Sequence, residues 1–245
     1  MNELESLKPM LLAKLKEIPK TRILILVLLI TSIPFLILTL IFCLNELRLL
    51  QTTGYGILNF ELAWTPEMMQ SIFGAWGSSE MQQQVFFTYL DFVYIISYGF
   101  FGAECLLLVS RKLEGKLQEI GILMALTFFI AGIFDTIENI NLLNMLDNPV
   151  SFWVYNPLLA SICASFKIGF LGAGLGFLYI ASIVIIGKKL SLSHFYLYIM
   201  LIGGGLILIG LFIFWNLFVC LLIGTIYFLM LFLLSWRVGL SVSEG

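Results

Sequence analysis

Long apolar runs separated by short polar segments dominate the sequence. Each run reaches about the twenty residues that a helix needs to cross the hydrocarbon core of a bilayer. The last run, Phe195 to Ser235, is uncharged and about twice that length. We divide it at Trp215-Asn216, although Gly203-Gly204-Gly205 offers another break. The pattern predicts an all-α, polytopic integral membrane helix bundle of about six transmembrane helices. The predicted spans are 23–44, 86–109, 120–139, 157–186, 195–214 and 217–235.

Polar segments flank the predicted membrane domain, which covers residues 23–236. In the N-terminal segment 1–22, leucines and an isoleucine recur at helical spacing while the lysines take the other faces. This amphipathic pattern is typical of a helix that lies on a membrane surface. Residues 237–245 form a short tail.

The basic residues indicate which way the helices cross the membrane. With six spans both termini lie on one side, and that side then carries nearly all lysines and arginines outside the spans. The opposite side carries only Arg48. Because positive loops stay in the cytoplasm, this segregation predicts cytoplasmic N- and C-termini, and the cell membrane as the location.

The loop 45–85 is the longest segment between predicted spans. The alternation from Phe60 to Trp64 favours a short strand. Thr65-Pro66-Glu67 then predicts the start of a short helix, because a hydroxyl cap, an early proline and an early acid all suit a helix N-terminus. The apolar stripe of this helix either packs onto the ends of the membrane helices or forms a lid, and the sequence leaves both open.

Composition supports a membrane protein and excludes several other classes. The chain has 245 residues, of which 60% are hydrophobic and 11% charged, and its mean hydropathy is +1.04. A soluble domain has about twice that charged fraction. No basic face suited to nucleic acid is present. The four cysteines lie singly in apolar runs and His194 is the only histidine, so no metal and no cofactor is predicted.

Two predicted spans carry acidic residues on helical faces. Asp135, Glu138 and Asn139 are spaced i, i+3 and i+4, so they share one face of the third span. Asp91, Tyr94 and Tyr98 share a face of the second span by similar spacing. If the third helix ends near Asn141, Asp135 lies about two turns from its end, at a depth similar to that of Asp91. Both phenols are suitable hydrogen-bond donors to a carboxylate. We expect Glu104 to reach the membrane surface near Arg111 instead.

Lys167 is the only basic residue inside a predicted span. A buried lysine needs a carboxylate partner, and Asp135 or Glu138 is the natural candidate. One lysine leaves the carboxylates in excess, which favours a ligand, ion or proton site over a purely structural pair. The predicted ligand-binding residues are Asp91, Tyr94, Tyr98, Asp135, Glu138, Asn139 and Lys167.

Small residues on the fourth span indicate a second contact face. Gly172 and Gly176 form a G-x-x-x-G step on a face away from Lys167, with Gly169 close by. Such steps let helices approach closely in a membrane. We therefore expect partner membrane helices at these three glycines.

One succession of residues resembles a known group of proteins. The succession is Phe60 to Trp64, Thr65-Pro66-Glu67, Leu90-Asp91-Phe92, Tyr98-Gly99, Asp135 to Asn139, and Lys167. It is similar to an uncharacterised group of small multi-pass membrane proteins with an Asp-x-x-Glu-Asn signature. The resemblance covers roughly Asn59 to Tyr179, leaves the fifth and sixth spans outside, and implies no activity.

Three functions are compatible with these residues. The first is binding or transport of a small or amphipathic ligand, an ion or a lipid, in a cavity covered by the loop 59–76. The second is a membrane-embedded lipid-modifying enzyme that uses paired carboxylates as acid and base. The third is a structural or accessory subunit stabilised by a buried Asp/Glu–Lys network. We favour binding or transport.

Overall fold

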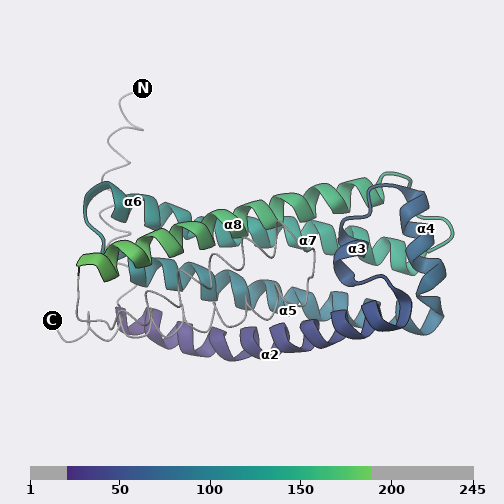
Figure 1. Ribbon diagram of the computed structural model, residues 1–245, viewed down its shortest axis with the longest axis horizontal. Coiled ribbons are helices and arrows are strands. Elements are labelled where there is room, and N and C mark those ends of the chain that lie inside the picture. Colours follow the sequence, from purple (N-terminus) through teal and green to yellow (C-terminus); the bar gives the residue numbers. More distant parts are fainter. Residues whose placement is uncertain (1–20, 189–245) are drawn as a thin grey trace, which may run out of the picture. The chain divides into compact units, whose positions relative to one another are not determined.

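The computed structural model describes residues 21–188, and every regular element within them is a helix. The prediction of an all-α fold is therefore confirmed for this part of the chain. Four helices are long and three are short (Figure 1). They are α2 (Thr21–Thr53), α3 (Ile57–Glu61), α4 (Pro66–Ala75), α5 (Gly77–Ser110), α6 (Gly115–Met124), α7 (Leu126–Asp147) and α8 (Asn156–Lys188).

Four stretches of the described chain are long and apolar enough to cross a membrane. They are Arg22–Thr53, Gly77–Ser110, Gly115–Asp147 and Asn156–Ala181. They identify a membrane protein, and they contain or overlap the first four predicted spans with extensions beyond them. The predicted spans 195–214 and 217–235, the segment before Thr21, His194 and the tail 237–245 lie outside the described residues.

The chain divides into two compact units. The first unit contains, among the described residues, 21–32, Phe100–Phe128 and 173–188. The second unit contains Ile33–Gly99 and Phe129–Gly172. In the second unit, parts of α2, α5, α7 and α8 run alongside one another, and α3 and α4 lie at one end of them (Figure 1). All the predicted site residues belong to this second unit.

The helix predicted after Thr65 is confirmed as α4. The Thr65 hydroxyl accepts a hydrogen bond from the Met68 amide at 3.3 Å, and Pro66 takes the first helical position. Glu67 lies in the first turn, where its own backbone N–H and the Thr65 side chain stabilise the carboxylate and hold its pKa below the usual value. These interactions satisfy amides that a helix start leaves without partners.

The strand predicted from Phe60 to Trp64 is wrong. Residues Ile57–Glu61 form the short helix α3 instead. A strand needs a neighbour for its backbone groups, and no strand occurs among the described residues. Gly54, at a φ of +79°, turns the chain after α2 so that α3 can fold back toward the helix bundle of the second unit.

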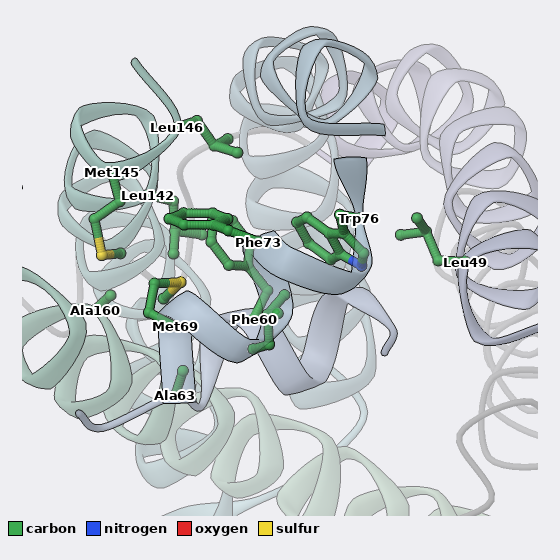
Figure 2. Close-up of a cluster of buried hydrophobic side chains, with 11 residues drawn as sticks. Leu49, Phe60, Ala63, Met69, Phe73, Trp76, Leu142, Met145, Leu146 and Ala160 are labelled. Atoms are coloured by element: carbon green, nitrogen blue, oxygen red, sulfur yellow. The ribbon is translucent and has the colours of Figure 1, made fainter. Parts of the chain in front are cut away.

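Helix α4 packs its apolar stripe onto the ends of the long helices. The buried cluster joins side chains from α2, α3, α4, α7 and α8, with Trp76 completely buried between Phe60 and Leu49 (Figure 2). The Trp76 indole N–H donates to the Tyr55 carbonyl at 3.0 Å. This packing answers the question left open by the sequence, since the buried side chains of α3 and α4 are part of the core. The cluster consists of Leu49, Phe60, Ala63, Met69, Ile72, Phe73, Trp76, Leu142, Met145, Leu146 and Ala160.

In the first unit, helices approach closely at two glycines that were not predicted as contacts. The Phe128 ring of α7 is almost fully buried against Gly102 of α5 and Gly174 of α8. A Cβ at Gly174 would lie 2.6 Å from the Thr127 hydroxyl oxygen and 2.8 Å from the Phe128 ring. By contrast, a Cβ at each of the three predicted contact glycines meets no atom of the described chain within 4 Å. Those three are Gly169, Gly172 and Gly176.

Gly174→Ala is expected to destabilise the protein by about 1–3 kcal/mol, because the added methyl overpacks the Phe128 site. Gly176→Ala, two residues along the same helix, is the matched control and should be neutral or stabilising by up to about 1 kcal/mol. Denaturant unfolding in detergent micelles measures both. Equal stability of the two variants would contradict the packing described at Gly174.

Candidate functional site

The acidic faces of α5 and α7 lie deep in the second unit. At a rise of about 1.5 Å per residue, Asp91 is about 21 Å from the start of α5, and Asp135 is about 18 Å from the end of α7. Helix α7 continues to Asp147 and does not stop near Asn141. Asp135 therefore lies farther from the helix end than the sequence suggested. Because α5 is also longer than its predicted span, the two carboxyls still share a similar depth.

Lys167 contacts three carboxylates at once. Its Nζ lies 3.1 Å from Glu61 Oε2 and 3.2 Å from Asp135 Oδ1. It also lies 2.9 Å and 3.1 Å from the two carboxylate oxygens of Glu138. The expected pairing with Asp135 or Glu138 is confirmed, and both residues take part. We call Glu61, Asp135, Glu138 and Lys167 the carboxylate–lysine network.

Two further hydrogen bonds extend from this network. The Tyr98 hydroxyl donates to Asp135 Oδ2 at 2.8 Å. On the neighbouring turn, the Asn139 amide donates to Asp91 Oδ2 at 2.7 Å. The structure therefore brings α5, α7 and α8 together through polar side chains, as their helical spacing predicted. The role of these residues in ligand binding stays a prediction.

The Tyr94 hydroxyl is hydrogen-bonded to Thr39, whereas the sequence suggested a carboxylate partner. The Tyr94 ring stacks on Phe35 with centroids 5.7 Å apart and meets Tyr98 edge-on at 5.4 Å. Its hydroxyl is hydrogen-bonded with that of Thr39 at 3.1 Å. Since the Thr39 hydroxyl already donates to the Phe35 carbonyl at 2.7 Å, the Tyr94 hydroxyl is the donor in this bond. Tyr94 thus supports Tyr98 by packing.

Burial within the network is uneven. The side chains of Glu138, Asp135 and Lys167 are 0%, 4% and 11% exposed, whereas that of Glu61 is 18% exposed. Glu138 Oε2 is buried close to the ammonium, yet accepts no hydrogen bond from the described residues. Glu61 is consequently the most accessible carboxylate of the network.

Sequence reasoning missed Glu61. It was assigned to a strand, so its side chain had no predicted direction toward the membrane helices. As the last residue of α3, it instead reaches Lys167 of α8. The available signal was a single acid within the otherwise uncharged stretch 57–64.

Glu46 of α2 holds the start of α3. Its buried Oε2 accepts a hydrogen bond from the Ile57 amide, which belongs to the first residue of α3. Its carboxylate also occupies the space that a Cβ at Gly56 would need. At the other end of the same turn, Asn59 accepts from the Gly56 amide at 2.9 Å. These contacts fix α3, and therefore Glu61, against the long helices.

Glu46→Ala is expected to loosen α3, because the Ile57 amide then loses its acceptor inside the protein. Amide exchange at Phe60 and Leu62 should rise roughly tenfold, in line with the loss of about 1–3 kcal/mol for an unpaired buried donor. Hydrogen exchange read by mass spectrometry measures this locally. Glu67→Gln, an exposed acid of the same segment, is the control, and unchanged exchange in Glu46→Ala would refute the anchoring role.

A groove of about 310 Å³ lies on the surface of the second unit. It differs from the expected cavity beneath the 59–76 loop, because none of the network side chains lines it. Only Trp64 comes from that loop, and the other lining residues come from α8. The lining residues are Trp64, Leu158, Ser161, Ile162, Ser165 and Phe166.

Other chemistry-bearing groups lie apart from the network. Glu104 of α5 is 4% exposed in the first unit and accepts a hydrogen bond from the Thr31 hydroxyl at 3.2 Å, so its side chain is directed inward and not to the membrane surface. Cys43, Cys105 and Cys163 form no disulfide within the described residues. Within residues 21–188, no group of three or more His, Cys, Asp and Glu side chains is arranged to hold a metal ion.

Comparisons with protein-family models, curated proteins and solved structures find no match to this chain. We therefore infer the function from the geometry and charge of the network.

Proposed function

We propose that this chain is a binding or transport protein of the cell membrane, and that the carboxylate–lysine network binds a proton or a small cation. One observation carries the proposal: two buried carboxylates and one half-buried carboxylate surround a single ammonium. If all four groups are ionised, their formal charge is −2, and Asp91 beside them makes it −3. Excess charge of this kind is costly within a membrane.

Neutralisation requires either protons on the carboxyls or a bound cation. Like charges that share one site cannot all ionise without a large penalty, so at least one exchangeable positive charge is expected there. Side-chain exposure falls from Glu61 to Glu138. This difference supports entry of the cation at Glu61 and its retention at Glu138. Cytoplasmic termini place the 54–76 segment on the outer side of the membrane, which makes the outer aqueous phase the source of the cation.

A test uses the full chain in nanodiscs of uncharged lipid. Calorimetric titration with methylammonium, sodium and potassium should show saturable binding of at least one of these ions. Asp135→Asn and Glu138→Gln should each lower that affinity, whereas Glu67→Gln, outside the network, should leave it unchanged. Absence of binding for all three ions at every pH at which the protein is folded would reject cation binding.

The burial of the network favours a second candidate, a purely structural role. Lys167 already has three acceptors, and such a network can serve only to fix the register of α7, α8 and α3. In that case Asp135→Asn and Glu138→Gln change the free energy of unfolding, and no ion binds. The same titration therefore separates cation binding from a purely structural role.

A further inference from the structure

The groove and the network are neighbours in the second unit. Phe166 of the groove directly precedes Lys167, so their Cα atoms are about 3.8 Å apart. Trp64 of the groove follows Glu61 by three residues, which limits their separation to about 11 Å. Groove residues on both segments are thus close along the chain to residues that form the network.

The groove has the chemistry of a site for an apolar tail. Trp64, Ile162 and Phe166 are 63%, 42% and 51% exposed, on a segment and a helix that belong to the membrane protein's surface. Two serines add the only polar side chains, and the Ser165 hydroxyl already donates to the Ser161 carbonyl at 2.8 Å. A volume of about 310 Å³ matches the lower end of small-molecule sites.

The network supplies the complementary head group. Its formal charge is negative, and Glu61, its most exposed carboxylate, precedes Trp64 by three residues. The three carboxylates already bind one primary ammonium group, because Lys167 Nζ lies 2.9–3.2 Å from each of them. A primary ammonium has three N–H donors for such acceptors, whereas a quaternary ammonium has none.

We propose that the groove and Glu61 together form a binding site for an amphipathic primary amine, with the apolar tail along Trp64 and α8 and the ammonium group at Glu61. This inference rests on the proposed function and names its ligand class. Because the network is negatively charged, the site should favour an amine over uncharged or anionic amphipathic molecules. Because the groove is apolar, the site should favour an amine with an apolar tail over small cations.

The test compares chain-length selectivity between variants. Dissociation constants for methylammonium and octylammonium are measured on the full chain in nanodiscs of uncharged lipid, and their ratio is taken for each protein. Partition of octylammonium into the bilayer contributes equally to all variants, so differences in the ratio report the groove. Octyltrimethylammonium, with the same tail and no N–H donor, tests the head group.

Trp64→Ala and Ser165→Phe, which open and fill the groove, should each reduce the octyl-to-methyl selectivity about tenfold, as expected for about two methylenes that lose their contacts. Glu61→Gln should weaken binding of both amines. Octyltrimethylammonium should bind the wild type at least tenfold more weakly than octylammonium. Trp153→Ala and Glu67→Gln, outside the groove and the network, should leave the selectivity unchanged.

Selectivity that is the same in the wild type, Trp64→Ala and Ser165→Phe would place the tail in the bilayer and overturn the proposal. Equal affinity for the primary and quaternary amines would also overturn it. If methylammonium binds the network but the groove variants keep the octyl-to-methyl selectivity of the wild type, only this inference fails. If neither methylammonium nor octylammonium binds, this inference fails, and the sodium and potassium titrations decide whether the proposed cation binding fails with it.

Discussion

Lys167→Met is expected to destabilise the protein by about 3–5 kcal/mol at neutral pH. The substitution removes the only cation of the network and leaves Glu61, Asp135 and Glu138 facing one another. Breaking a buried ion pair in this way costs more than the pair contributes, because the remaining charges stay buried without compensation. Unfolding by denaturant in micelles measures the change.

Two controls isolate the network. Lys116→Met removes an exposed lysine and should change stability by no more than about 0.5 kcal/mol. Lys167→Arg keeps the charge and should retain more stability than Lys167→Met. If Lys167→Met is as stable as the wild type at neutral pH, the contacts around Lys167 do not support the fold.

Trp76→Ala is expected to have the second large effect on the free energy of unfolding, because it removes packing contacts. Trp76 is completely buried, its ring centroid is 5.0 Å from that of Phe60, and its indole donates to the Tyr55 carbonyl. The cavity left by truncation of a buried tryptophan should cost about 3–5 kcal/mol. Because Phe60 belongs to α3, the variant should also increase amide exchange throughout α3 and loosen Glu61.

Trp153→Ala provides the matched control, since Trp153 is 59% exposed and its loss should cost about 1 kcal/mol or less. Trp76→Phe keeps an aromatic ring and removes only the indole donor, so it should fall between the two. Thermal unfolding in micelles ranks the three variants. A Trp76→Ala protein no less stable than Trp153→Ala would mean that the 54–76 segment does not pack as described.

The long helices were predictable because their signal is strong and local. Apolar runs of membrane-spanning length admit few alternatives to a helix, since a lipid-exposed backbone must satisfy its own hydrogen bonds. Helical spacing also placed Asp135, Glu138 and Asn139 on one face. The same reasoning could not fix where a helix ends, and α7 continues to Asp147 because a helix can extend beyond the bilayer.

The short elements were harder to predict because their contacts are not local. The alternation of Phe60 to Trp64 resembles a strand, but α3 depends on the Glu46 carboxylate of another helix and on the buried Trp76. For the same reason, nothing local to Glu61 indicated that it meets Lys167. A run of small residues likewise gives candidates for close approach, and only the packing of Phe128 distinguishes Gly174 from Gly172.

Proton release on cation binding reports directly whether the network carries an exchangeable positive charge. Methylammonium is added to the protein in weakly buffered nanodiscs, at matched pH and ionic strength, and a pH-sensitive dye reports the protons released. We expect release of up to about one proton per chain, with less in Asp135→Asn and Glu138→Gln and no change in Glu67→Gln. Methylammonium that binds without proton release, or with a release that both network variants retain in full, would contradict this expectation.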